Sequence, residues 1–472
     1  MNVLYVTSEA NPFAKSGGLA DVAGSLPKAL VADGIETRVV MPLYGDLKGK
    51  DKLTYLTNFS VPVGWRSQYC GVFTAVEGGV TYYFLDNEYY FDRKGLYGFY
   101  DDGERFAFFS RAVLEMLFCI DFAPDILNCN DWQSGLVPVY LNLYYRHLDK
   151  FNKLKTVFTI HNIAYQGKYG LEVLEEICGI SRRDQHLVEY DGCANFMKGA
   201  IECADKITTV SPTYAGEILD PWFSYGLDGL LKEKQYKLCG ILNGIDYETN
   251  DPETDPALAK NYSAKTVAKG KLVCKETLQD KYGLEKDGSP VYGMVSRLVG
   301  MKGFDLVRSI ADGLVSQGIQ LVVLGTGESE YEHYFSELAA KNPGRVGVTI
   351  GFDVKLAQQI YAGSDVFVMP SKSEPCGLAQ MVSCRYGTIP IIRETGGLKD
   401  SIQDCTLGTG NGFTFAQYNA HDLFGACDRA QKAFEKPKDW ANLVQYAMRC
   451  DFSWSISAKS YAGLYNEVMY LW

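Results

Sequence analysis

The chain has few of the residue patterns that mark metal and disulfide chemistry. It contains only five histidines, no two of its 13 cysteines are separated by two residues, and no two aspartates are separated by one residue. These absences argue against a zinc ribbon, a thioredoxin-type redox motif and an aspartate pair that clamps a divalent metal. The odd number of scattered cysteines predicts reduced thiols, most of them buried.

A basic surface and long apolar runs are also missing. The 57 acidic and 46 basic residues give a formal net charge of −11, which argues against binding nucleic acid. No stretch reaches the ~18–20 apolar residues that a membrane span needs. The first ten residues, MNVLYVTSEA, predict a strand because no basic segment precedes the apolar run. We therefore expect a cytoplasmic protein whose partners are neither nucleic acid nor membrane.

What the chain does have is length and an alternating α/β pattern. Its 472 residues, 47% of them hydrophobic, suffice for two cores. A strand at 3–8, a glycine loop, a helix at 19–32 and a strand at 36–41 predict a βαβ unit. The β-rich residues 55–86 predict hairpins or a meander inserted into this first domain. Further strands at 125–129, 155–161 and 206–210 alternate with helices at 104–119, 135–146 and 195–204.

The second half repeats the alternation more regularly. Strands are predicted at 291–296, 319–324, 346–350, 365–370 and 389–392, with helices between them, which is typical of a doubly wound domain. The polar, proline-containing residues 249–262 are the best linker candidate. The fold class is thus α/β, with domains at 1–248 and 249–452 and a final helical segment at 453–472.

Ligands of open α/β sheets bind at the carboxyl ends of the strands, so we looked for polar groups there. The first such site is the loop with Lys15, Gly17 and Gly18, where backbone N–H groups and a helix N-terminus favour an anion. The alternative is a tight turn with a surface lysine. The loop is not the G-x-G-x-x-G dinucleotide motif.

A second site combines Arg297, at the end of a strand, with Lys302, just before a helix. Two cations there would bind a leaving diphosphate without a metal; the alternative is ordinary surface charge.

A third site is Glu374, in a loop that precedes a helix opened by Gly377, although a glutamate there also suits a helix N-terminus. The fourth is His161, whose alternative is a structural histidine.

These residues lie in strings that resemble one known family, the bacterial glycogen synthases and plant starch synthases. The strings run nearly from end to end of the chain in the family's order: KSGGLADVAGSLPKAL, NCNDWQSGLVP, HNIAYQG, NFMKGAI, TVSPTYA, NGID, SRLVGMKG, GTGESEYE, EPCGLAQM, YGTIP and TGGLKDSI. One string would be weak evidence, but the whole series in register is specific. The resemblance implies a GT-B fold, with two Rossmann-like domains that face a deep cleft and a C-terminal helix that returns to the first domain.

The resemblance further implies the reaction. It is transfer of glucose from ADP-glucose to the non-reducing end of an α-1,4-glucan, with retention of configuration, without a metal or pyridoxal phosphate. We can name no residue that recognises the base of the nucleotide. The implied partners are the glucan acceptor, glycogen or starch, and the nucleotide sugar.

The resemblance also implies roles for single residues. The catalytic set is Glu374, His161, Arg297, Lys302 and Asp131. The donor-binding set is Lys15, Gly17, Gly18, Asn243, Cys376, Gly377, Leu378, Thr395, Gly396 and Gly397. The acceptor-binding set is Trp132 and Tyr165, and no metal ligand is implied.

The chain departs from the family pattern at some positions. The family often has H-x-H-D-W-H where this chain has Asn128, Asn130 and Gln133 at the histidine positions. Alternatives also stay open: another retaining GT-B glycosyltransferase, a glucan-binding relative without activity, and a phosphorylase that uses pyridoxal phosphate. An assay of products with glycogen as primer tests the first, glucan binding without donor turnover would support the second, and a purified protein without the absorbance of pyridoxal phosphate would exclude the third.

Overall fold

The computed structural model describes residues 1–470, which fall into two compact units. Unit 1 comprises Met1–Gly244 and the C-terminal segment from Trp454 onward, and unit 2 comprises Ile245–Ser453. We expected the first boundary after residue 248, and it lies a few residues earlier, after Gly244. We expected the second after residue 452, and it lies one residue later, after Ser453.

Unit 1 is built on a nine-stranded sheet with the order β12-β11-β7-β6-β1-β2-β5-β4-β3. Six of its strands, together with β5, form a continuous parallel set: β1 (Asn2–Val6), β2 (Glu36–Pro42), β6 (Ile126–Asn130), β7 (Lys155–Ile160), β11 (Lys206–Thr209) and β12 (Leu238–Gly240). A small separate sheet contains β8 (Lys168–Tyr169), β9 (Glu189–Tyr190) and β10 (Cys193–Asn195). The parallel set brings the carboxyl ends of β1, β6 and β7 to one edge.

The predicted inserted meander is confirmed. β3 (Thr54–Val63) and β4 (Arg66–Glu77) pair antiparallel, and β4 pairs antiparallel with β5 (Val80–Asp86). Because β5 also runs parallel to β2, the insertion extends the main sheet rather than forming a domain of its own.

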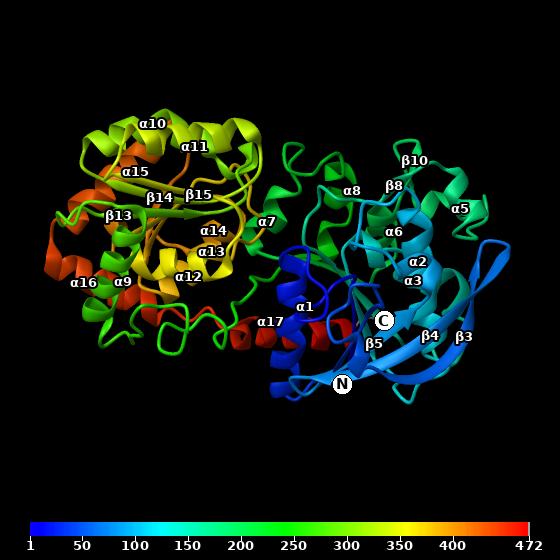
Figure 1. Cartoon of the computed structure of the whole chain (residues 1–472). Coiled ribbons are helices and arrows are strands. Elements are labelled where there is room, and N and C mark those ends of the chain that lie inside the picture. Colours follow the sequence, from blue (N-terminus) through cyan, green and yellow to red (C-terminus); the bar gives the residue numbers. More distant parts are fainter. Residues whose placement is uncertain (471–472) are drawn as a thin grey trace. The chain divides into compact units, whose positions relative to one another are not determined.

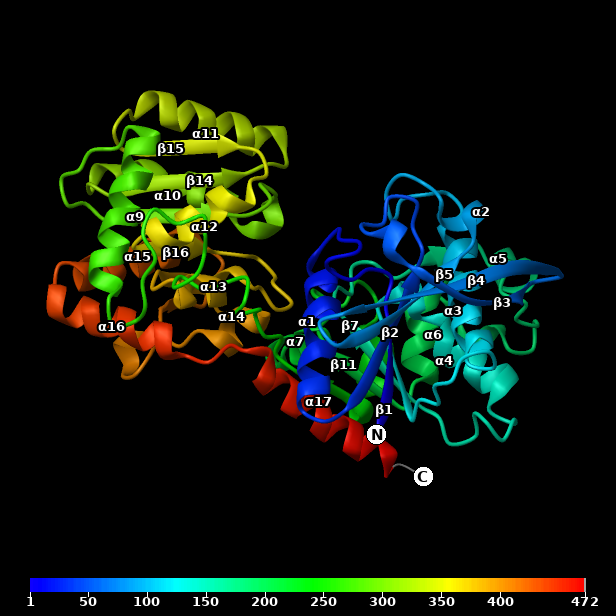
Figure 2. The same ribbon diagram turned by 60° about the horizontal axis from the view of Figure 1, so that its bottom comes forward.

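Helices cover both faces of the unit 1 sheet. α1 (Gly18–Ala32) and α17 (Trp454–Met469) pack together on one side, while α3 (Asp102–Met116), α4 (Leu136–Tyr140) and α6 (Phe196–Cys203) lie on the other (Figures 1 and 2). The final helix therefore belongs to the first unit, as expected. Shorter helices are α2 (Glu88–Phe91), α5 (Glu172–Glu176), α7 (Pro212–Glu217) and α8 (Asp228–Glu233).

Unit 2 contains a parallel six-stranded sheet with the order β15-β14-β13-β16-β17-β18. Its strands are β13 (Val291–Val295), β14 (Gln320–Gly325), β15 (Val346–Ile350), β16 (Val366–Met369), β17 (Ile389–Arg393) and β18 (Phe413–Phe415). The order reverses direction at β13, which is the doubly wound topology expected from the sequence.

Helices also flank this second sheet. α10 (Phe304–Ser316) and α11 (Ser329–Lys341) lie on one face, and α12 (Val354–Gly363) and α13 (Ala379–Arg385) on the other (Figure 1). The remaining helices are α9 (Val267–Tyr282), α14 (Gly396–Ser401), α15 (Ala420–Phe434) and α16 (Pro437–Arg449). Aliphatic side chains of β13, β14 and α12 form its core, including Val291, Val322, Leu324, Leu356 and Ile360.

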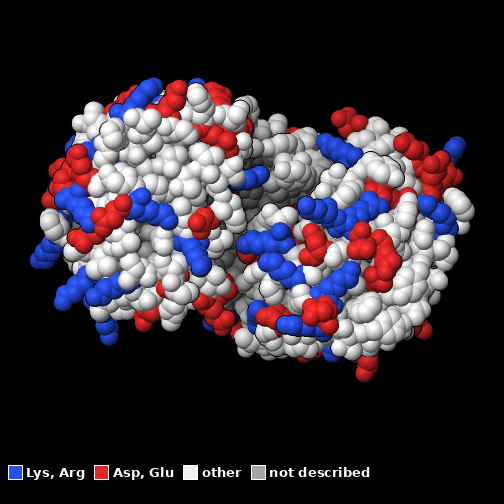
Figure 3. All heavy atoms as spheres, viewed as in Figure 1, with Lys and Arg blue, Asp and Glu red and all other residues white. Residues whose placement is uncertain are grey.

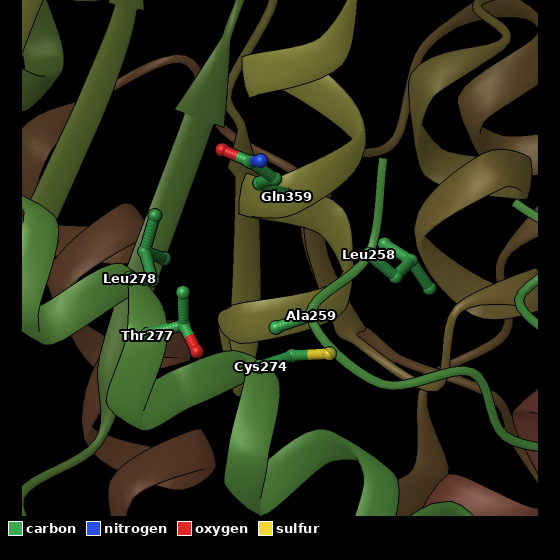
Figure 4. A pocket seen from close by; sticks show the side chains of 6 residues that line it. All are labelled: Leu258, Ala259, Cys274, Thr277, Leu278 and Gln359. Atoms are coloured by element: carbon green, nitrogen blue, oxygen red, sulfur yellow. The ribbon is translucent and has the colours of Figure 1, made fainter. Parts of the chain in front are cut away.

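The linker predicted at residues 249–262 is wrong, because this segment packs onto unit 2. The Tyr262 hydroxyl donates to the Tyr386 carbonyl at 2.8 Å, and the Tyr386 hydroxyl donates to buried Asp255 at 2.6 Å. A cavity of about 20 Å³ remains where the segment passes α9 and α12 (Figure 4), lined by Leu258, Ala259, Cys274, Thr277, Leu278 and Gln359. It has room for about one water molecule.

No helix within residues 1–470 is both long enough and apolar enough to cross a membrane. On the face drawn in Figure 3, basic and acidic side chains are interspersed over both units. All 13 cysteines lie in the described part of the chain as free thiols.

Candidate active site

In unit 2, the predicted site residues follow three strands that are neighbours in the sheet. Arg297 and Lys302 follow β13, Glu374 follows β16, and Thr395 follows β17. β16 pairs with both β13 and β17 in parallel, so these three loops emerge at one edge. The loops that carry these residues therefore lie next to one another within this unit.

Lys302 and Glu374 form an ion pair, with 2.5 Å between Nζ and Oε2. The Ser371 hydroxyl donates to the same carboxylate oxygen at 3.1 Å. Both charged side chains are largely buried, so water screens their attraction weakly. Gly303 has a φ of +78°, and a Cβ there would lie 2.1 Å from the Pro370 carbonyl oxygen, so only glycine lets the two loops approach.

The side chain of Arg297 differs from that of Lys302 in its exposure and in its contacts. Its side chain is exposed, and no ion pair or hydrogen bond holds its guanidinium within the described residues. A guanidinium presents paired N–H donors that match the oxygens of a phosphate. Arg297 is therefore available to an anion, whereas Lys302 already neutralises Glu374.

The loop before α13 is held by the glycines that follow β17. Gly396 has a φ of +43°, and a Cβ there would lie 1.9 Å from the Glu374 carbonyl oxygen. The Gly397 N–H donates to the carbonyls of Glu374 and Pro375 at 3.3 and 3.1 Å. Thr395, at the N-terminal end of α14, is fully buried. The Thr395–Gly397 turn thus fixes the backbone that carries Glu374.

Gly377 does not open a helix, contrary to the expectation from the sequence. It has a φ of +70°, which is outside helical geometry, and α13 begins only at Ala379 with Leu378 as its N-cap. Cys376 is buried in the same turn, and its carbonyl accepts from Gln380 at 3.2 Å. Glycine is needed here to turn the chain from the loop into the helix.

In unit 1, Asp131 ties the loop after β6 to the loop after β7. Its Oδ1 accepts the backbone N–H groups of His161 at 2.8 Å and Asn162 at 3.4 Å. Burial raises the pKa of the Asp131 carboxyl to about 7, and the charge of Glu9 adds to this rise. Asp131 itself has a φ of +54°, an uncommon conformation for a residue with a side chain.

The His161 imidazole is held in one tautomer by Asn130. The Asn130 Nδ2 donates to the carbonyls of Val6 at 2.9 Å and Asn128 at 3.1 Å, so its Oδ1 faces His161 as an acceptor. His161 Nε2 lies 2.9 Å from that oxygen and must carry the proton. Burial lowers the pKa of His161 to about 3, so the ring is neutral and Nδ1 keeps its lone pair.

Lys15, the predicted donor-loop lysine, lies in the loop before α1. Its Nζ is 2.6 Å from Asp21 Oδ1, and its side chain is 49% exposed. An exposed pair of this kind contributes little to stability and can be exchanged for another anion.

The N-terminus of α1 already holds a carboxylate from within unit 1. Glu9 is buried and accepts the Ser16 N–H at 2.5 Å. Burial raises the pKa of Glu9, while backbone hydrogen bonds from Ser16, Ala20 and Gly17 oppose the rise. Glu9 therefore already accepts from one of the N–H groups of the loop that the sequence predicts as an anion site, that of Ser16.

The remaining predicted residues differ in the exposed fraction of their side chains. Trp132 is 8% exposed and packs among the rings of Phe106, Tyr169 and Phe196, which is a core position. Tyr165, by contrast, is 62% exposed. Asn243 follows β12, and its buried Oδ1 has no hydrogen-bond partner within residues 1–470. A buried acceptor without a donor suits a ligand hydroxyl or amine.

Sequence reasoning missed Glu9, Asn130 as the partner of His161, and Ser371. A signal existed for each, since all three stand at or just beyond the carboxyl end of a parallel strand. Among residues 1–470, no three His, Cys, Asp or Glu side chains are grouped so that they could hold a metal ion.

Comparison with known proteins gives matches over both units. Residues 2–233 match a family model described as the starch synthase catalytic domain, and residues 275–447 match one described as glycosyl transferases group 1. The chain is 50% identical to a glycogen synthase from Geobacillus thermodenitrificans over 477 residues, which cover 99% of this chain and 98% of the relative. A glycogen synthase from Geobacillus stearothermophilus matches with the same identity and coverage.

A solved structure is similar over the same length. The catalytic domain of starch synthase IV from Arabidopsis thaliana, bound to ADP and acarbose, has a TM-score of 0.89 and 34% identity. The match covers 99% of this chain and 99% of that one.

Proposed function

Because the chain belongs to the family of glycogen and starch synthases, which are GT-B glycosyltransferases, we propose that it transfers glucose from ADP-glucose to the non-reducing end of an α-1,4-glucan. The names of its relatives support the glucan product, and the bound ADP of the plant neighbour supports the adenine nucleotide. Retention of configuration at the glucose carbon is part of the proposal.

One observation carries the mechanism: Arg297 stands unpaired at the sheet edge where Lys302 and Glu374 meet. As the bond between glucose C1 and the diphosphate oxygen breaks, negative charge grows on the departing ADP. Arg297 and Lys302 stabilise that charge, as a preorganised cationic site does in other transfer reactions. The Lys302 ammonium has three N–H donors, so it can donate to a diphosphate oxygen while it stays paired with Glu374.

The acceptor enters on the face from which the diphosphate leaves. The oxygen of its 4-hydroxyl forms the new bond to C1, and its proton passes to an oxygen of the departing phosphate. Glu374 is no nucleophile in this proposal, because Lys302 and Ser371 already hold its carboxylate. Its charge instead supports the electron-poor glucose ring.

Side chains of unit 1 bind and orient the two substrates in this proposal. Neutral His161 is oriented by Asn130 and Asp131, and it offers a lone pair and a backbone carbonyl to a sugar ring. We assign Lys15 to the nucleotide sugar, where a phosphate would replace Asp21 as its partner. Asn243 offers its buried oxygen to a donor hydroxyl, and exposed Tyr165 offers a ring face to the glucan.

For Trp132 we propose a different part from the one that the resemblance implies. Since its ring is buried among other aromatic rings, we propose that it supports the loop of Asp131 and touches the glucan little.

The test is glucose transfer to glycogen, measured side by side with ADP-glucose and UDP-glucose. We expect radiolabelled glucose to enter an α-1,4-glucan from ADP-glucose, and the product to be degraded by an α-1,4-specific amylase. Binding of glycogen with no transfer from either donor would instead indicate a glucan-binding relative without activity. Preference for UDP-glucose would remove the adenine part of the proposal only.

A further inference from the structure

Unit 2 has a second hollow, which is separate from the loops just described. A cavity of about 730 Å³ lies between α15, α16 and the loop 405–413. This loop leads into β18, so the cavity lies toward the amino ends of the parallel strands, whereas Arg297 and Glu374 follow carboxyl ends. Its volume falls within the ~300–1,000 Å³ range of small-molecule sites.

The lining of this cavity is basic, although the chain as a whole is acidic. Four cationic side chains and one carboxylate, that of Asp439, line it; the cations are Arg429, Lys432, Lys436 and Arg449. Two of the cations are paired with acidic residues outside the lining, Arg429 with Asp404 and Lys432 with Asp428, which leaves Lys436 and Arg449 without an acidic partner among the described residues. Over the full sequence, acidic residues outnumber basic ones by 57 to 46. A local reversal of the charge balance favours a negatively charged occupant.

Three of the cations lie close together, and two of them are only partly satisfied. Arg429 and Lys432 are three residues apart within α15, which places them on one side of that helix, and Lys436 lies in the turn between α15 and α16. Arg429 pairs with Asp404 at 3.1 Å, yet its buried Nε has no partner within the described residues. Lys436 is exposed and forms no ion pair with any residue that the structure describes.

The other wall of the cavity is aromatic. Trp440 packs edge-on against Phe434, with 5.3 Å between ring centroids, and stays partly exposed one turn after Lys436. Leu443 and Tyr446 follow at three-residue spacing on α16, and Tyr446 is 43% exposed. Such a surface accepts the flat face of a ring.

We propose that this cavity binds a small phosphorylated ring compound, a sugar phosphate or a nucleoside phosphate, as a second site beyond the proposed transferase site. The phosphate lies on Arg429, Lys432 and Lys436, and the ring lies against Trp440. A neutral glucan would use the aromatic wall but would bring no negative charge to the Lys436 ammonium or to the guanidinium of Arg429, whose Nε has no acceptor among the described residues.

The experiment is a titration of the full-length protein, followed by tryptophan fluorescence and calorimetry. ADP is left out, because a nucleoside diphosphate at saturation would itself fill the proposed site, and the variants below separate this cavity from nucleotide binding elsewhere. The probes are glucose 1-phosphate, AMP, inorganic phosphate and maltotriose. We expect glucose 1-phosphate or AMP to bind saturably, and which of them binds more tightly distinguishes the two sources. Lys436→Ala should weaken that binding about 10-fold, because a charge-assisted hydrogen bond is lost.

Control variants separate a loss of binding at this cavity from effects of a substitution elsewhere in the protein. Lys438→Ala removes an exposed lysine two residues away that does not line the cavity, and it should bind as the parent does. Trp440→Phe should abolish the fluorescence change but keep most of the calorimetric affinity. All three variants should keep the thermal midpoint and the basal glucose transfer of the parent.

Three results would overturn the proposal. They are the absence of saturable binding of both phosphorylated rings at millimolar concentration, binding that Lys436→Ala and Lys438→Ala leave equally strong, and binding of maltotriose alone. The last result would identify a glucan site instead.

Discussion

At the scale of single residues, the neutral imidazole of His161 depends on its neighbour Asn130. The amide of Asn130 is fixed by two carbonyl acceptors, and this leaves one acceptor for His161 Nε2. The sequence showed that an asparagine stands where the family often has histidine, but it gave no reason to pair Asn130 with His161. That pairing depends on β6 and β7 being neighbours, which is a property of the sheet.

Asn130→Ala should lower kcat about 10-fold and leave KM for the donor nearly unchanged, because one hydrogen bond that orients the ring is lost. Asn130→His should restore part of the rate. Asn130→Asp should raise the pKa of His161 and introduce a new ionisation into the pH profile of kcat. ¹⁵N NMR of the imidazole reports the tautomer directly, and an unchanged spectrum in Asn130→Ala would contradict this role.

Asp131 provides a test of stability against pH. Its folded pKa of about 7 lies above the ~3.9 of an unfolded aspartate, so the folded state keeps a proton that the unfolded state loses. The contribution to stability is therefore full below about pH 4 and is lost as pH rises through 7. Asp131→Asn keeps the acceptor for the His161 N–H but cannot ionise.

The thermal midpoint of Asp131→Asn, relative to that of the parent, should consequently increase between pH 4 and 7 and level off above about pH 8. Differential scanning calorimetry at a series of pH values measures it. Parallel curves for the two proteins would show that Asp131 is not buried as described.

At the scale of elements, periodicity and glycine positions predicted most strands and helices well. The helix expected at 135–146 is an exception, since α4 ends at Tyr140 and a π-helical turn, Leu141–Tyr145, follows. An apolar stripe does not distinguish an α-turn from a π-turn. Gly377 is another exception. A glycine just before a helix suggests the first residue of that helix, and the sequence does not show that the φ of Gly377 is positive.

Gly396→Ala tests the turn that holds the Glu374 loop. The new methyl group would meet the Glu374 carbonyl at 1.9 Å in a conformation that alanine rarely adopts. We expect a loss of about 2 kcal/mol or more in the free energy of unfolding, and a clear loss of glucose transfer. Urea denaturation and initial rates measure the two effects.

Gly425→Ala is the matched control for that substitution. Gly425 lies within α15, and a Cβ there meets nothing within 4 Å. Alanine should therefore raise the stability by about 0.5–1 kcal/mol and leave the rate unchanged. Equal losses in both variants would refute the account of the turn.

At the scale of the whole molecule, the α/β pattern predicted the doubly wound second unit, and the family resemblance implied a similar first unit and the return of the final helix to it. It did not predict that residues 249–262 pack onto unit 2, because their polar composition suggests a linker. The packing depends on a few anchors, such as Tyr262 and Asp255, and composition averages over single residues.

Tyr465→Phe tests how α17 is joined to unit 1. The Tyr465 hydroxyl donates to Asn128 Oδ1 at 2.9 Å, and both groups are buried. Losing the donor leaves a buried acceptor unsatisfied, so the free energy of unfolding should fall by about 1–3 kcal/mol. Tyr470→Phe, at a position that is 81% exposed, should change nothing. Equal thermal midpoints for the two variants would contradict the importance of this hydrogen bond.

The central claim is that cations at the edge of the unit 2 sheet replace a metal in stabilising the departing ADP. The turnover of Arg297→Ala with saturating ADP-glucose and glycogen tests it most directly, because Arg297 is exposed and its loss should not disturb the fold. We predict a ~100-fold lower kcat with an unchanged thermal midpoint, while Lys355→Ala, an exposed lysine on α12, keeps the parent rate. A turnover of Arg297→Ala near that of the parent would contradict the account.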